Sequence, residues 1–135
     1  MALIVDTGPL VALLDATDPD HERCTDLLQS SAEPRVVPVC VLVEAEYLLR
    51  PWPQAFPALL ADFEAGGLEL LDLPARWLLR AGELVDRYRD LPLGLVDATV
   101  IAATEMLRET KVATLDHRHF TVVRPAHTPA LTLLP

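Results

Sequence analysis

Basic residues are scarce in this chain. Of its 135 residues, 11 are lysine or arginine and 20 are aspartate or glutamate, which gives a formal net charge of −9. Proteins that bind nucleic acids usually carry a basic face, so the overall charge alone argues against such a partner. The acidic excess is compatible with two other features, a cluster of carboxylates that binds metal and a basic protein partner.

Cysteines and long apolar runs are also scarce. The two cysteines, Cys24 and Cys40, do not form a CxxC pair, which argues against a zinc knuckle. No apolar run approaches the ~18 residues needed to cross a bilayer. The first residues lack the basic start and long apolar stretch of a secretory signal. We therefore expect a cytoplasmic protein with no membrane segment.

The length and composition indicate one globular domain. Hydrophobic residues make up 51% of the chain and charged residues 23%, which is typical of folded proteins. A chain of 135 residues can bury a core without disulfides. We see no internal repeat or low-complexity tract, and predict a single domain over residues 1–135.

Short apolar runs alternate with helical patterns along the chain. Strands are predicted at residues 2–5, 35–38, 68–73, 111–115 and 130–134. Helices are predicted at residues 10–15, 19–30, 39–49, 55–64, 75–89 and 95–108. This alternation favours an α/β fold with a central parallel sheet and helices on both faces. In such sheets the functional site lies beyond the carboxyl ends of the strands.

Four acidic residues stand out by their positions. Asp6 and Asp116 each follow an apolar strand, and Glu44 and Asp97 lie inside apolar helices. Each has an ordinary interpretation when taken alone, as a helix cap, a turn residue or a partly exposed helix residue. Together they predict one site, because two of them end strands and two sit on helices that could pack beside those strands.

The choice between two neighbouring glutamates rests on their helical positions. Glu44 shares a helix face with Val41 and Leu48, three residues before it and four after it. A carboxylate on an apolar stripe is costly unless it is paired or bound to metal. Glu46 has Arg50 four residues later and can form a surface ion pair with it. Leu42 and Leu49 also flank Glu46, so the pattern favours Glu44 for the site without deciding between the two glutamates.

The chemistry of the four acids favours a hard divalent cation. Carboxylates without cysteine are the ligands of Mg²⁺ or Mn²⁺. These metals activate water and neutralise charge on a phosphodiester, so an RNA substrate is compatible with the net charge of −9. His117 and His119 lie beside Asp116 and are open candidates, although surface or core roles are more common for such histidines.

Four segments that contain these acids resemble a known family. They are IVDTGPL at Ile4–Leu10, VLVEAEYLL at Val41–Leu49, LGLVDA at Leu93–Ala98 and ATLDHRHF at Ala113–Phe120. Each is short, but their order and spacing resemble PIN domains, and the VapC toxins most closely. The resemblance extends from Leu3 to about Pro125.

The resemblance implies a fold, an activity and partners. The fold is a three-layer α/β/α sandwich, and the activity is that of an endoribonuclease dependent on Mg²⁺ or Mn²⁺, often acting on tRNA or ribosomal RNA. The partners are a VapB-like antitoxin and frequently a second copy of the chain. The acidic ligands implied by position are Asp6, Glu44, Asp97 and Asp116. Thr7 matches the small hydroxyl residue after the first aspartate, and Thr114 is expected to support the last.

Two other classes of protein remain as alternatives. A signalling receiver domain also binds Mg²⁺ at an acidic cluster, but it has paired acids after the first strand and a lysine at a late strand end. Here Lys111 begins its strand instead. A PIN fold retained only as a binding module, without turnover, is the second alternative. An activity assay separates this second class from the enzyme.

Overall fold

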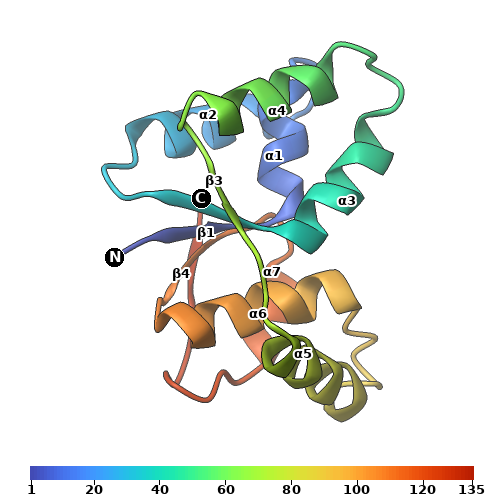
Figure 1. Cartoon of the computed structure of the whole chain (residues 1–135), viewed down its shortest axis with the longest axis vertical. Helices are drawn as coiled ribbons and strands as arrows, with labels where there is room; N and C mark the ends of the chain where they lie inside the picture. The colour runs from blue at the N-terminus through green and yellow to red at the C-terminus, as the bar shows by residue number, and fades with distance from the viewer.

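Five short parallel strands form the central sheet of the computed structural model, which describes residues 1–135 (Figure 1). They are β1 (Leu3–Val5), β2 (Arg35–Pro38), β3 (Glu69–Leu71), β4 (Lys111–Ala113) and β5 (Thr132–Leu134). Their order across the sheet is β3-β2-β1-β4-β5, which puts β1 at the centre. Ile4 of β1 pairs with Val36 on one side and Val112 on the other.

Seven helices surround this sheet. They are α1 (Thr7–Leu14), α2 (His21–Ser30), α3 (Val39–Leu49), α4 (Ala55–Glu64), α5 (Ala75–Arg87), α6 (Leu95–Leu107) and α7 (His117–Val122). Helices α1, α2 and α4 lie over one face of the sheet, and α5 and α6 lie over the other (Figure 1). The predicted three-layer sandwich with a parallel sheet is confirmed. No helix is both long enough and apolar enough to span a lipid bilayer.

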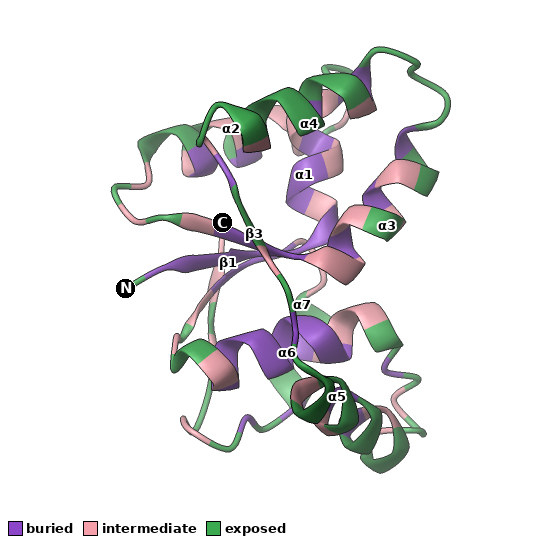
Figure 2. Cartoon of the chain, viewed as in Figure 1, coloured by how far each residue is buried: buried purple, intermediate pink, exposed green.

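The core follows from strands and helices that are apolar on every side. Leu3, Ile4 and Val5 of β1 are all buried, as expected for a strand covered on both faces (Figure 2). Helix α6 is buried without interruption from Ala98 to Glu105. Its small residues let the helix axis approach the sheet closely, which fixes the position of its first turn.

The structure differs from the predicted elements in three places near the site. Helix α1 begins at Thr7, earlier than the predicted start at Leu10, because Pro9 is tolerated in a first turn, where N–H groups have no helical partner. Helix α7 is absent from the predicted elements, since its six residues are too few to show a hydrophobic period. The predicted strand at residues 111–115 also ends early, at Ala113.

A buried ion pair ties α5, α6 and the C-terminal segment together. Arg80 donates from Nε and Nη2 to the two carboxylate oxygens of Glu105, over 2.8 and 2.9 Å. The same carboxylate accepts the main-chain N–H of Ala126 at 2.9 Å. Burial raises the pKa of Glu105, but these hydrogen bonds outweigh it and leave the pKa below its ordinary value.

We predict that Arg80→Ala lowers the free energy of unfolding by about 3 kcal/mol, because it leaves the Glu105 carboxylate buried and unpaired. Arg89→Ala is the control, since Arg89 pairs with Asp86 on the surface and should cost less than about 1 kcal/mol. Urea denaturation at neutral pH measures both. A lowered pKa makes the pair's contribution fade as the pH falls through it, so the gap should narrow in acid. Equal losses in the two variants would contradict a special role for this pair.

Candidate metal centre

All four predicted acids lie at the carboxyl edge of the sheet. Asp6 follows β1 directly, and its main-chain N–H continues the sheet by donating to Ala113 O at 2.9 Å. Asp116 lies just beyond the end of β4, while Glu44 and Asp97 come from α3 and α6. The charges of Asp97 and Glu44 both act on Asp6, and that of Asp116 acts on Asp97. The structure therefore brings the four together from four separate segments.

Asp6 is the most buried of these acids, with 5% of its surface exposed. It occupies the N-cap position of α1, but its side chain forms no capping hydrogen bond, so the ordinary interpretation as a cap is wrong. Its Oδ2 accepts instead from the Thr114 hydroxyl at 2.8 Å. The pKa of Asp6 is raised to about 6. Burial is the main cause and the Asp97 and Glu44 charges add to it, whereas hydrogen bonds from the Thr7 main chain and the Thr114 hydroxyl oppose it.

His119 joins Asp97 and Asp116. Its Nδ1 lies 2.7 Å from Asp116 Oδ2 and 3.2 Å from Asp97 Oδ2, and one ligand atom from each of the three residues lies within 4.8 Å of the others. Burial and the Asp116 charge raise the pKa of Asp97, and the contact with His119 lowers it. The sequence left the two histidines open. The structure places His119 at the site, whereas His117 is exposed.

Asp116 has two roles in this geometry. It is the N-cap of α7, and its Oδ1 accepts the main-chain N–H of His119 at 3.2 Å. The cap therefore starts the short helix that returns His119 to the acids one turn later. An aspartate followed by a histidine at the third position after it was the signal in the sequence for this contact.

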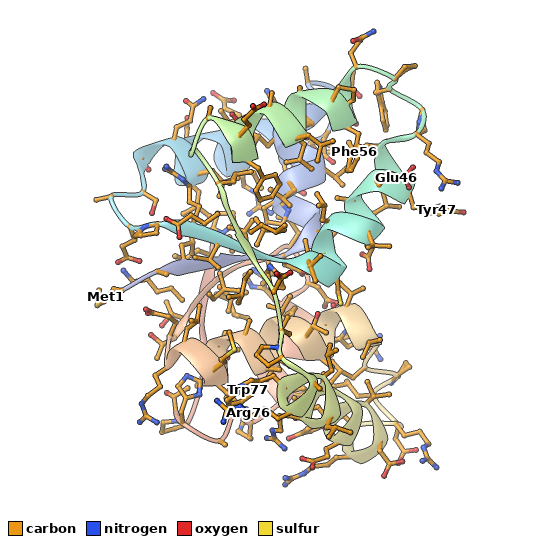
Figure 3. All side chains as sticks on the ribbon, in the orientation of Figure 1. Met1, Glu46, Tyr47, Phe56, Arg76 and Trp77 are labelled. Carbon is orange, nitrogen blue, oxygen red and sulfur yellow. The ribbon has the colours of Figure 1, made fainter.

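The two glutamates of α3 face different surroundings. Arg50 donates to both oxygens of Glu46 at 3.1 Å, on the outer side of α3 (Figure 3). Glu44 is half-buried, and its pKa is raised by burial and by the Asp97 charge, with the Thr7 hydroxyl opposing the increase. The apolar stripe used to choose Glu44 is only half correct. Val41 is buried, but Leu48 is 43% exposed.

The donor set fits a divalent cation. No lysine or arginine forms an ion pair with Asp6, Glu44, Asp97 or Asp116, and His119 is the one partially compensating group. Burial and mutual repulsion raise the pKa of three of these acids. The Thr7 hydroxyl is also buried beside them, close enough to Glu44 to oppose the increase in its pKa. Oxygen donors with uncompensated negative charge are the ligands that Mg²⁺ and Mn²⁺ prefer.

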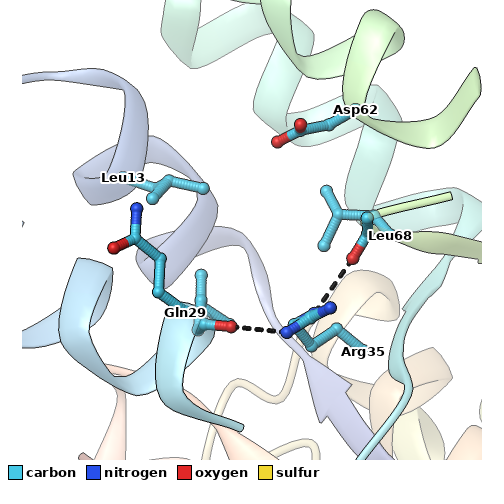
Figure 4. Close-up of a pocket in the computed structure, with 7 residues that line it drawn as sticks. Leu13, Gln29, Arg35, Asp62 and Leu68 are labelled. Atoms are coloured by element: carbon cyan, nitrogen blue, oxygen red, sulfur yellow. Dashed lines mark hydrogen bonds between the residues drawn. The ribbon is translucent and has the colours of Figure 1, made fainter. Parts of the chain in front are cut away.

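A separate hollow of about 320 Å³ lies away from this centre (Figure 4). It opens near Arg35, the first residue of β2, and therefore at the amino edge of the sheet. Arg35 donates to the carbonyl oxygens of Gly67 and Leu28 at 2.9 and 2.8 Å. Its guanidinium is thus used to hold loops together, and the hollow contains none of the four acids.

Comparison with known proteins identifies the family. No family model matches the chain. Ribonuclease VapC26 of Mycobacterium tuberculosis is 33% identical to it over 135 residues, which cover 98% of this chain and 100% of that protein. This chain belongs to the VapC ribonuclease family. The family that its sequence motifs resemble is therefore confirmed by identity along nearly the whole chain.

Solved structures of VapC proteins share the fold. Mycobacterium tuberculosis VapC20, a toxin that cleaves the sarcin-ricin loop, superposes with a TM-score of 0.76 at 24% identity, over 82% of this chain and 87% of that one. The Rickettsia felis VapBC2 structure, bound to a promoter DNA fragment, matches at a TM-score of 0.71 and 18% identity over 100% of both chains. At these identities the likeness shows the fold alone.

We predict that Asp6→Asn stabilises the metal-free protein. The carboxylate of Asp6 is disfavoured by burial, so its raised pKa destabilises the native state as the pH rises from about 4 to above 6. Replacing it with a neutral amide should recover on the order of 1–3 kcal/mol at pH 7.5. Thermal unfolding in EDTA measures this gain, which should shrink at pH 4.

Added Mg²⁺ or Mn²⁺ should reverse the ranking, because a ligand of the native state stabilises only the protein that binds it. The wild type should gain melting temperature with metal, and Asp6→Asn should gain little. An equal gain in both proteins would place the metal away from Asp6.

Proposed function

We propose that this chain is a metal-dependent endoribonuclease and the toxin of a VapBC-type pair, with the whole chain acting as one PIN domain. The observation that carries the proposal is the meeting of Asp6, Glu44, Asp97 and Asp116 at one sheet edge without a compensating cation. Membership of the VapC family supports RNA as the substrate. The substrate class that we infer is tRNA or ribosomal RNA, and cleavage of the sarcin-ricin loop by VapC20 is a precedent within the fold.

The four acids would hold Mg²⁺ or Mn²⁺, with His119 beside them as a further candidate ligand. When bound, the metal lowers the pKa of water and neutralises charge on the phosphodiester. Each residue has a separate task in this proposal. Thr114 keeps Asp6 oriented through its hydroxyl, and His119 holds Asp97 and Asp116 at a fixed separation.

Glu44 is the candidate for the group that orients the attacking water or accepts its proton. It is only half-buried, and its raised pKa brings it closer to neutral pH than an ordinary glutamate. Because water attacks, and not the 2′-hydroxyl of the RNA, the products should carry 5′-phosphate and 3′-hydroxyl ends.

We predict that Glu44→Gln reduces cleavage of total tRNA in Mn²⁺ by at least roughly 10²-fold, as expected for loss of a general base or ligand. Glu46→Gln is the matched control. It lies on the same helix and removes the same charge, but its partner is Arg50 at the surface. Gel analysis of the products with end-group labelling measures both the rate and the chemistry.

Two results would count against this mechanism. Products with 2′,3′-cyclic phosphate ends would mean that the RNA's own hydroxyl attacked. Equal loss of cleavage in both variants would mean that α3 as a whole was damaged.

If neither the wild type nor any variant cleaves RNA, the chain is a PIN fold retained for binding.

We also propose an antitoxin partner and a homodimer. Antitoxin-containing assemblies among the structural neighbours, from Rickettsia felis and Klebsiella pneumoniae, support the first. Exposed apolar side chains support both, since Val43, Tyr47 and Leu79 are each more than 60% exposed. An antitoxin should place apolar side chains on such a surface and a basic side chain near Asp6 and Asp97.

We predict that the chain alone arrests growth of a bacterial host when expressed, and that co-expression of its cognate antitoxin restores growth. Asp97→Ala should be harmless, because it removes a candidate metal ligand. Colony counts and immunoblots of equal expression provide the measurement. A wild-type chain as harmless as Asp97→Ala would refute the toxin assignment.

A further inference from the structure

Charge is distributed unequally between the two parts of the chain. Residues 1–74 contain 13 acidic and 3 basic residues, whereas residues 75–135 contain 7 acidic and 8 basic residues. The first part includes α1, α2 and α4, which cover one face of the sheet, and the second includes α5 and α6, which cover the other (Figure 1). The net charge of −9 therefore describes neither face.

The arginines of the first part are already occupied. Arg23 pairs with Asp20, Arg50 pairs with Glu46, and Arg35 donates to main-chain carbonyls. In the second part, Arg124 also donates to a main-chain carbonyl, that of Thr121 at 2.6 Å, but four exposed arginines form neither an ion pair nor such a bond: Arg76, Arg87, Arg108 and Arg118. A guanidinium without a carboxylate partner remains available to bind phosphate.

Two of these arginines lie at the same end of the molecule as the acids. We call Arg87 and Arg118 the arginine rim. Arg118 follows Asp116 by two residues on the exposed side of α7. Arg87 is the last residue of α5, whose following loop leads into the first turn of α6, where Asp97 lies.

A hydrogen bond connects the end of α7, the helix that carries Arg118, to the end of α5, where Arg87 lies. The main-chain N–H of Arg124 donates to Tyr88 Oη at 3.1 Å, which holds the end of α7 against the end of α5. The Arg87 guanidinium lies 5.7 Å from the centre of the Tyr88 ring. The nearby acid Asp86 is already paired with Arg89. Exposed arginines without carboxylate partners therefore lie at α7, beside the metal centre, and at the end of α5, where Asp90 is the acid that remains unpaired.

We propose that the arginine rim binds the phosphate backbone of the RNA substrate and sets the side from which RNA enters the metal centre. This inference rests on the proposed ribonuclease function. RNA runs along α7 and the end of α5, and the acidic surface of α2 and of the loop before it repels it. Because these side chains contact phosphates away from the scissile bond, they position the substrate and take no part in the chemical step.

The chain offers a closely matched control. Arg76 and Arg108 are also exposed and unpaired, but they lie at the other ends of α5 and α6. Arg76 lies 5.6 Å from the centre of the Trp77 ring at the start of α5, much as Arg87 lies over Tyr88 at its end (Figure 3). The double variants Arg87→Gln/Arg118→Gln and Arg76→Gln/Arg108→Gln each remove two positive charges, so they have the same net charge.

The test combines binding and kinetics with bulk tRNA as the probe. Binding is measured by fluorescence anisotropy in an Asp97→Asn background with Mg²⁺, at several salt concentrations. The arginine-rim pair, the variant Arg87→Gln/Arg118→Gln, should weaken binding roughly tenfold at low salt. It should also reduce the slope of log K against log salt by about one for each phosphate that is no longer neutralised. The control pair should change the affinity by less than about twofold.

Cleavage by the otherwise wild-type enzyme gives an independent readout. The arginine-rim pair should raise KM for tRNA and leave kcat nearly unchanged, because it removes binding that is equal in the ground and transition states. Equal effects of the two pairs on affinity, salt slope and KM would overturn the arginine rim while leaving the ribonuclease function intact. A wild-type chain that neither binds nor cleaves RNA would overturn both.

Discussion

The repulsion among carboxylates at the carboxyl edge of the sheet is the constraint on which the site depends. Asp6 is almost fully buried and lies within reach of the Asp97 and Glu44 charges, with no lysine or arginine paired to any of them. Such an arrangement is unfavourable without a cation, because burial and like charges both oppose ionisation. It persists because the elements that carry the acids are fixed by apolar packing elsewhere.

That packing explains why the acids cannot move apart. Asp6 follows a strand whose residues are buried on both faces, and Asp97 lies in the first turn of a helix that is buried without a break over the next two turns. Retreat of either acid would expose part of the core, at a cost of ~25 cal/mol for each Å² of apolar surface. The core therefore supplies the free energy that keeps the site assembled and negatively charged.

Most of the fold and the four acidic positions followed from the sequence for this same reason. A strand buried on both faces is a continuous apolar run, so the acid that ends it is conspicuous, as with Asp6 and Asp116. Contacts between distant elements left weaker signals. His119 meets Asp97 only because α7 turns back, and a helix of six residues is too short to be recognised by its period. Leu48 fits the apolar pattern of α3, yet it is exposed, because the face of this helix that packs on the core carries Val41, Ala45 and Leu49.

The distribution of charge resolves the apparent conflict between an acidic chain and an anionic substrate. Within one or two Debye lengths, about 8 Å each at physiological salt, a polyanion responds to the groups beside it and not to the distant total. The acids on α2 and in the loop before it are paired with few cations, while Arg87 at the end of α5 and Arg118 on α7 lack carboxylate partners. The acids at the metal centre are the exception, and a divalent ion would neutralise part of their charge locally. An acidic chain can thus present a surface suited to phosphate at the one edge where its carboxylates are needed.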